Sequence, residues 1–165
     1  MALRSLSLWA VLAALSLLYF LCAPIPILQI KPSEGVFFKQ VAPVGQAFIL
    51  RYIHSVERTP VEDEYTISNG TFWQWEERVR SHNAGLPLLP SETGKFFAGK
   101  DWFRFRGGRQ SFDVLFLRIG NAERGRNELN VVGIGKWELY KQFPGEKMEI
   151  RVIEDSLLNL FAERL

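Results

Sequence analysis

Cysteine and histidine are scarce in this chain, and their scarcity excludes two classes of small protein. The 165 residues include one cysteine and two histidines. This set cannot form an internal disulfide framework or a zinc-finger cluster. An excess of charge of one sign is also missing, because 20 Lys and Arg residues against 18 Asp and Glu residues leave a formal net charge of +2. That balance excludes a basic nucleic-acid-binding arm, so we expect no nucleic-acid partner.

Internal repeats, low-complexity tracts and a second-domain linker are also missing. The length falls in the usual range for one domain, about 100–200 residues. Apolar residues make up 47% of the chain and charged residues 23%, which are ordinary values for a globular protein. The sequence therefore predicts one folded domain beside any targeting segment.

The longest stretch without a charged side chain lies near the N-terminus, between Arg4 and Lys31. Its strongly apolar part runs from Leu6 to Ala23 and is rich in Leu and Ala, which favour helices. As a helix, residues 5–23 would span about 29 Å, which matches the hydrocarbon thickness of a bilayer. Pro24 would end that helix, because proline lacks the amide and crowds the preceding turn. The pattern predicts a transmembrane helix.

A cleaved signal peptide is the alternative interpretation of this segment. A signal peptide has a shorter apolar core and a small-x-small site before the cut. Here Leu21-Cys22-Ala23 precedes Pro24, so leucine occupies a position where signal-peptide cleavage requires a small residue. We therefore expect an uncleaved anchor in residues 1–30 and a single β-rich extracytoplasmic domain in residues 31–165.

From Gly35 onward, apolar side chains alternate with period two, which predicts β-strands. Roughly seven or eight short strands with turns about ten residues apart are typical of a sandwich or barrel. Asp155 or Ser156 would cap a short helix from Leu157 to Arg164. We expect an all-β fold, an antiparallel β-sandwich or barrel-like domain, with the N-terminal transmembrane helix and this short C-terminal helix.

Turn residues predict how the strands connect. Ala47–Val56 and Val61–Ser68 form a first hairpin, and Asn69-Gly70 forms a type I′ turn into the next strand, Phe72 to Arg80. The glycine-rich and proline-rich stretch Ser81–Lys100 is predicted as a loop. A second hairpin joins two further strands through Gly107-Gly108, namely Trp102–Arg106 and Arg109–Leu117.

The first hairpin places the most reactive side chains. The register that matches apolar residues across it pairs Val56 with Val61, and it then sets His54 opposite Asp63. An imidazole facing a carboxylate gains a hydrogen bond that fixes its tautomer. His54 then either contacts a ligand or acts as a base, or it is a structural histidine at the end of a core face, with its hydrogen bonds made within the fold. Ser55 points to the other face of the strand, which makes a Ser–His dyad improbable.

Glu62 and Glu64 lie on that other face, where Arg51 is placed to pair with Glu64. Such a pair is usually solvated and contributes about 0–1 kcal/mol. Paired carboxylates also serve acid–base chemistry, which is the competing interpretation. Trp73 and Trp75 share a face with Glu64, and they are either packed core residues or a stacking platform for a sugar or apolar ligand.

Two further groups are candidates for metal or anion binding. His82 would have to join His54 and a glutamate around a metal, and the sequence indicates no third ligand, so we expect no metal and no cofactor. Arg104, Arg106 and Arg109 surround the glycine pair of the second hairpin. They form either a solvated hairpin end or a site for anionic headgroups or a carboxylate.

Three short motifs carry a family resemblance: His54-Ser55-Val56, acidic residues after the following turn, and Ala84-Gly85-Leu86-Pro87. In this order they resemble the small bacterial family called domain of unknown function 1850. Its members typically combine an N-terminal hydrophobic segment with one β-rich domain, and they are often encoded beside TAXI-type TRAP transporters. The family commonly has an aromatic residue just before its acidic residue. The segment Pro60–Tyr65 lacks that order, so Glu62, Asp63 and Glu64 all stay candidates for it.

The resemblance implies both a cellular location and a partner. It implies a single-pass protein of the bacterial inner membrane, held by residues 6–23, with its C-terminal domain in the periplasm and TRAP transporter subunits as partners. The expected function is a non-enzymatic module accessory to such a transporter. The alternative is a small periplasmic ligand-binding protein or hydrolase that uses His54 with Asp63 or Glu64. The candidate ligand-binding residues are His54, Ser55, Glu62, Asp63, Glu64, Gly85 and Pro87.

Overall fold

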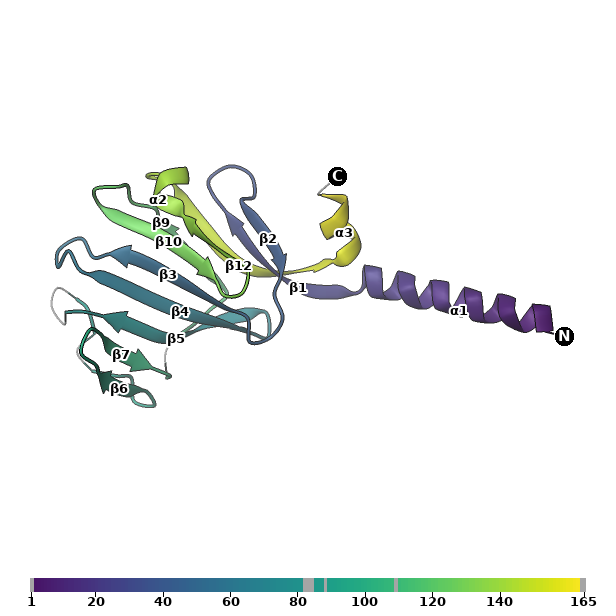
Figure 1. The fold of residues 1–165 in the computed structure, drawn as a ribbon, viewed down its shortest axis with the longest axis horizontal. Coiled ribbons are helices and arrows are strands. Elements are labelled where there is room, and N and C mark those ends of the chain that lie inside the picture. The colour runs from purple at the N-terminus through teal and green to yellow at the C-terminus, as the bar shows by residue number, and fades with distance from the viewer. Residues whose placement is uncertain (1, 82–84, 88, 109, 164–165) are drawn as a thin grey trace.

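The computed structural model describes residues 2–81, 85–87, 89–108 and 110–163. Helix α1 (Ala2–Cys22) extends away from a β-sandwich that contains most of the remaining described chain (Figure 1). The helix stops just before the prolines, as their chemistry predicts. Within the part of the chain that the structure describes, no helix is long and apolar enough to cross a membrane.

Two antiparallel sheets form the sandwich, so the all-β prediction is confirmed. The smaller sheet has the strand order β2-β1-β12-β9, with β1 (Pro24–Lys31), β2 (Phe38–Val41), β9 (Val114–Arg118) and β12 (Lys147–Ser156). The larger sheet has the order β11-β10-β3-β4-β5-β7-β6, and β8 pairs with β5 beside this path. Its strands are β3 (Ala47–Ile53), β4 (Pro60–Ser68), β5 (Thr71–Val79), β6 (Lys95–Ala98), β7 (Phe103–Arg106), β8 (Ser111–Phe112), β10 (Gly125–Val131) and β11 (Gly135–Glu138).

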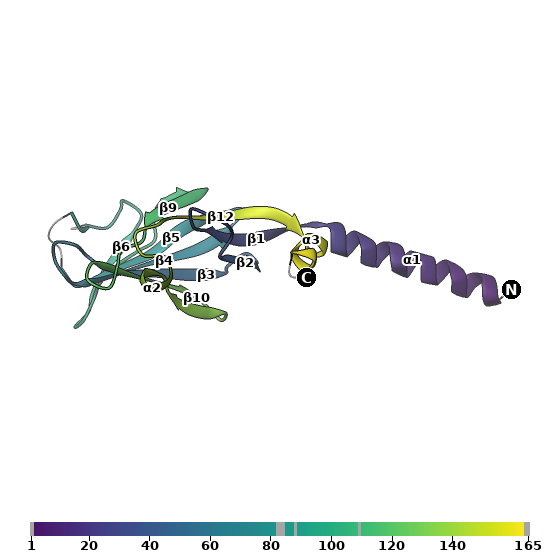
Figure 2. The same cartoon turned by 90° about the horizontal axis from the view of Figure 1, so that it is seen from above.

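The main hydrophobic core lies between the two sheets, which Figure 2 shows as two layers. Ile30 and Ile150 of the smaller sheet belong to the same buried cluster as Phe48, Tyr65 and Phe72 of the larger one. Phe48 stacks on the Tyr65 ring with centroids 5.0 Å apart. Aromatic pairs of this kind add about 0.5–1.5 kcal/mol to the burial of their area. The face of the larger sheet that meets this core is called its inner face below, and the opposite one its outer face.

Strand β1 begins immediately after α1, so the predicted boundary between residues 30 and 31 falls inside a strand. Its central residues are buried on both faces, which removes the alternation by which a strand is recognised in a sequence. Pro24 and Pro26 fit because β2 pairs only with Ile27–Ile30. The prolines therefore lie where the strand has β12 as its single strand partner.

The predicted second hairpin is wrong. β7 pairs with β5 and with β6, and β6 lies in the stretch that was predicted to be a loop. β8 returns to β5, and β9 crosses to the smaller sheet, where it pairs with β12. The amide of Gly107 donates to the carbonyl of Trp75 at 2.8 Å, so the glycine pair fastens the chain to β5 instead of closing a two-strand turn.

Two local predictions are confirmed. Asn69 and Gly70 both have positive φ angles, 49° and 75°, and they join Ser68 to Thr71 across the β4–β5 turn. Ser156 caps the short helix α3 (Leu157–Ala162), because its side chain accepts a hydrogen bond from the amide of Asn159 at 3.1 Å. A second short helix, α2 (Leu139–Gln142), follows β11.

Lys39 of β2 ties α3 to the smaller sheet. Its Nζ lies 2.7 Å from Asp155 and 2.7 Å from Glu163. The hydrogen bond from Lys39, followed by those from Asn159 and the Ser156 amide, lowers the pKa of Asp155 to about 2. The same two carboxylates raise the pKa of Lys39, chiefly through the hydrogen bond to Asp155. The carboxylate of Asp155 is therefore held in its charged form by the fold.

Substituting Asp155→Asn should weaken the acid sensitivity of the fold. A carboxyl whose folded pKa is lowered contributes stability above its unfolded pKa, about 3.9, and loses it as the pH falls toward the folded value. Between about pH 4 and pH 2, the melting temperature of the wild type should therefore fall further than that of the variant. Glu123→Gln, in an exposed turn, is the control and should follow the wild type. Identical acid profiles for the wild type and Asp155→Asn would contradict the Lys39–Asp155 linkage.

Candidate functional site

The His54-Ser55-Val56 motif and Gly85–Pro87 of the Ala84–Pro87 motif both lie at the end of the sandwich away from α1 (Figure 1), whereas the acidic motif lies within β4. The β3–β4 connection carries the first motif there, and Gly85–Pro87 follow the end of β5. Leu86 is buried in a cluster with Val61, Val79 and Phe105. The side chain of Ser81 donates a hydrogen bond of 2.7 Å to Glu57 of the β3–β4 connection. We call residues 54–59, 81 and 85–87 the distal end.

The hairpin register differs from the prediction by four residues. Val61 pairs with Tyr52 instead of Val56. Asp63 therefore lies opposite Leu50, and the predicted pairing of His54 with Asp63 is wrong. A shift by an even number of residues leaves every side chain on its face, so alternation alone could not distinguish the two registers. The loop between the two strands covers residues 54–59 and is longer than the sequence predicted, and Arg58 within it adopts a positive φ of 55°.

His54 lies in this loop and holds its shape. Its amide donates to the carbonyl of Thr59 at 2.9 Å, and its Nδ1 accepts a hydrogen bond from the amide of Glu57 at 3.2 Å. Ser55 is exposed, and Val56 is 68% exposed rather than buried at the end of a core face. The His54-Ser55-Val56 motif therefore forms a hydrogen-bonded loop that exposes Ser55 and Val56 to solvent.

Asp63 lies on the inner face, beneath the distal end. Its carboxylate accepts a hydrogen bond of 3.0 Å from the side chain of Gln74, and Glu77 is its neighbour across the β4–β5 pair. Burial, together with the charges of Asp63 and Glu77, raises the pKa of both Tyr52 and Tyr65. The two hydroxyls therefore stay protonated and can donate hydrogen bonds at neutral pH.

A cavity of about 290 Å³ opens between the sheets beside this group. Apolar and polar side chains both line it, which suits a small ligand with one polar end. The lining residues are Leu50, Tyr52, Asp63, Tyr65, Leu115, Leu117, Arg118 and Asn127.

Glu62 and Glu64 lie on the outer face, so the sheet separates them from Asp63. Arg78 lies between them and pairs with both, at 3.2 Å from Glu62. The predicted pairing of Arg51 with Glu64 is wrong, because Arg51 pairs with Glu62 at 3.8 Å. Glu62, Glu64 and Arg78 are partly buried, whereas Arg51 is exposed.

Glu76 is the centre of this charged network, although no motif in the sequence singles it out. It is 1% exposed, and it accepts hydrogen bonds from the Nε atoms of Arg78 at 2.6 Å, Arg104 at 3.0 Å and Arg106 at 2.6 Å. Burial alone would raise its pKa, but the three guanidinium groups outweigh burial and lower it. Arg104 and Arg106 therefore donate hydrogen bonds to Glu76 and do not surround a hairpin tip. Arg109 lies outside the described residues.

A register shift between Glu64 and Tyr65 assembles the network. The extra residue in β5 brings Glu76 opposite Glu64, whereas Trp73 lies opposite Thr66. Trp73 and Trp75 are 49% and 48% exposed, so their interpretation as core residues is wrong. They border the charged network on an open face, where large flat rings are available to a partner.

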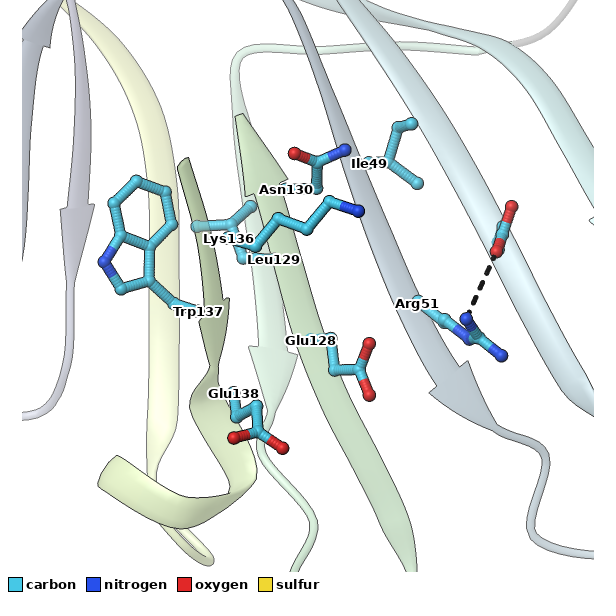
Figure 3. A pocket seen from close by; sticks show the side chains of 9 residues that line it. Ile49, Arg51, Glu128, Leu129, Asn130, Lys136, Trp137 and Glu138 are labelled. Atoms are coloured by element: carbon cyan, nitrogen blue, oxygen red, sulfur yellow. Dashed lines mark ion pairs between the residues drawn. The ribbon is translucent and has the colours of Figure 1, made fainter. Parts of the chain in front are cut away.

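The charged surface continues across β3, β10 and β11. A groove of about 510 Å³ lies there, and Figure 3 shows the side chains that line it, among them Arg51, Glu128 and Lys136. Cross-strand neighbours form one row over the whole outer face: Glu138, Glu128, Arg51, Glu62, Arg78 and Arg104. Charges of both signs are fixed on one rigid sheet, which suits recognition of a charged protein surface.

Among the described residues, no group of three His, Cys, Asp or Glu side chains is arranged to hold a metal ion. His82, which the sequence suggested as a second histidine ligand, lies outside the described residues, as does Ala84 of the Ala84–Pro87 motif.

Substituting Glu76→Ala should lower the free energy of unfolding by about 3 kcal/mol. Breaking a buried ion pair costs about 3–5 kcal/mol. The lower figure applies because Arg104 and Arg106 are partly exposed and can turn to solvent. Urea unfolding of the detergent-solubilised chain measures the change.

The matched control for this measurement is Glu138→Ala, which removes an exposed carboxylate that pairs with Lys141. Its unfolding curve should stay close to that of the wild type. Equal, small effects of both substitutions would show that Glu76 does not organise the outer face.

A comparison with known families agrees with the motifs. The family model described as "Domain of unknown function (DUF1850)" matches residues 48–135, which is more than half of the chain. No curated protein and no solved structure matches the sequence. The matched region runs from β3 to the first residue of β11, so it contains all three motifs and the Glu76 network. The resemblance drawn from the short motifs is thereby confirmed, and the chain belongs to the DUF1850 family.

Proposed function

We propose that this protein is a membrane-anchored, periplasmic β module that works by binding and serves as an accessory to a TAXI-type TRAP solute transporter. One observation carries the proposal: the apolar helix leaves the sandwich at one end, and two of the family motifs, His54-Ser55-Val56 and Gly85–Pro87, lie at the other (Figure 1). A domain built in this way holds its motif-bearing surface at a distance from its point of attachment.

The surface of α1 supports the anchor. From Leu8 to Leu21 its side chains are uncharged, and most of them are exposed, with Trp9 at 70% and Phe20 at 66%. The uncharged run in the sequence, residues 5–30, extends beyond these described side chains at both ends. Exposed apolar surface of this extent is found where a protein meets lipid or another protein. Insertion of residues 6–23 into the inner membrane would remove it from water.

The arrangement of the motif residues favours binding over hydrolysis. Hydrolysis by His54 with Asp63 or Glu64 needs one of these acids within hydrogen-bond reach of the imidazole. His54 instead accepts from the Glu57 amide, Asp63 lies opposite Leu50, and Glu64 pairs with Arg78. Each candidate group thus has a structural partner of its own.

The cavity between the sheets supports a second candidate function, a periplasmic ligand-binding protein. Its two tyrosine hydroxyls and the carboxylate of Asp63 are polar groups within a partly apolar wall. A small molecule with a polar head and an apolar body has the matching chemistry.

The topology of the anchor is directly measurable. Alkaline phosphatase fused after Leu165 should be active in a bacterial host, because residues beyond the anchor are expected in the periplasm. The fusion should also stay in the membrane fraction after carbonate washing, which removes peripheral proteins. An inactive fusion would contradict the topology, and a soluble species starting near Pro24 would reveal a cleaved signal.

Substitutions on the exposed surface should separate the distal end from other surfaces. Val56→Glu places a charge on the distal loop, where a partner would have to bury it, and it should abolish co-purification of transporter subunits from native membranes and reduce solute uptake. Phe116→Glu, on edge strand β9, is the matched control, since Phe116 is 72% exposed and Val56 is 68% exposed. Co-purification that survives Val56→Glu, or is lost equally in both variants, would contradict a partner site at the distal end.

A further inference from the structure

Helix α3 carries apolar side chains on two different faces. Leu160 is buried against the sandwich at 6% exposure. Leu158 and Phe161 are 48% and 57% exposed, and Ala162 is exposed beside them. These three positions have the i, i+3, i+4 spacing that puts side chains on one face of a helix. One face of α3 thus packs on the domain, and a second apolar face is left uncovered.

The pairing of β1 with β12 fixes where this uncovered face lies. Pro24, which follows α1, pairs with Ser156, which precedes α3. The two helices therefore start from adjacent positions on the sheet, and they contact each other. Figures 1 and 2 both show α3 beside the junction of α1 and β1. The exposed rings of Tyr19 and Phe20 lie on α1 near this junction.

The charged residues on either side of α3, Asp155 and Glu163, are already paired with the domain. Lys39 of β2 pairs with both Asp155 and Glu163, and Asn159 donates a hydrogen bond of 2.9 Å to Asp155. These contacts, with the Ser156 cap, set the orientation of the helix on the sheet. The apolar face of α3 is consequently held outward.

We propose that α3 rests on the membrane surface, with Leu158, Phe161 and Ala162 in contact with lipid. This inference depends on the proposed anchoring of α1, because α1 brings α3 to the bilayer. An exposed apolar helix face that adjoins a lipid-inserted helix is covered by the same lipid. The sandwich then has two attachments to the membrane, which limit its tilt and direct the distal end away from the bilayer.

The nature of the contact follows from the charges around it. Asp155 and Glu163 are acidic, and both are paired with Lys39. Among the residues that the structure describes around α3, this surface therefore offers apolar side chains and no excess of positive charge for anionic headgroups. We expect α3 to contact the acyl boundary of uncharged lipids, and high salt should leave the contact unchanged.

Spin labels in the full-length chain test this placement. In a Cys22→Ala background, the single substitutions Leu158→Cys and Phe161→Cys are each spin-labelled, and the protein is reconstituted into phosphatidylcholine vesicles. Both labels should be more accessible to oxygen, which concentrates in lipid, than to a water-soluble nickel chelate. A label at Phe116, which is exposed and apolar but lies on β9, is the matched control and should show the aqueous pattern.

A label at Leu12 of α1 separates the possible failures. If Leu12 shows the lipid pattern while 158 and 161 show the aqueous pattern, the anchor stands and the placement of α3 is refuted. If Leu12 itself shows the aqueous pattern, the proposed anchor fails, and the inference about α3 fails with it. Labels at 158 and 161 that are shielded from both reagents would mean that protein covers this face, either a second copy or another partner, and would also overturn the proposal.

Discussion

The antiparallel pairing of β1 with β12 is the constraint on which the rest of this structure depends. It joins the first and last strands along the whole length of β1, from Pro24–Ser156 to Lys31–Glu149, in the middle of the smaller sheet. Buried side chains of both strands, such as Ile30 and Ile150, form one wall of the main core. Because the strands are antiparallel, the helix before β1 and the helix after β12 must emerge at the same end. The β3–β4 connection lies at the opposite end of the sandwich from these two helices (Figure 1).

The larger sheet uses its two faces for different purposes. Its inner face supplies aromatic and aliphatic side chains to the core, and its outer face carries ion pairs centred on Glu76. A buried carboxylate is costly to desolvate, and a buried ion pair is weak evidence for stability. A role consistent with that cost is specification of register, because the contacts of Glu76 require β7 to lie beside β5 and require the bulge in β5. The same contacts leave Trp73 and Trp75 open to solvent beside a fixed pattern of charges.

Features that depend on a few neighbouring residues could be predicted from the sequence. The turn at Asn69-Gly70 and the Ser156 cap follow from backbone chemistry within four residues, and both are present. The register of the first hairpin could not be fixed, because alternation is indifferent to a shift of four residues. β1 was missed because its residues are buried on both faces and continue the apolar composition of the preceding segment. Glu76 could not be singled out, since its three arginine partners depend on a bulge and a long-range strand pairing.

Hydrogen–deuterium exchange of the full-length protein in lipid vesicles tests the central pairing most directly. Amides are protected according to the free energy of the opening that exposes them. If β1 and β12 form one continuous ladder, peptides covering residues 24–31 and 147–156 should be protected to the same high degree, well above peptides from the exposed strand β6. Rapid exchange of residues 24–31 beside a protected β12 would mean that this segment is a linker between helix and domain, and would contradict the account.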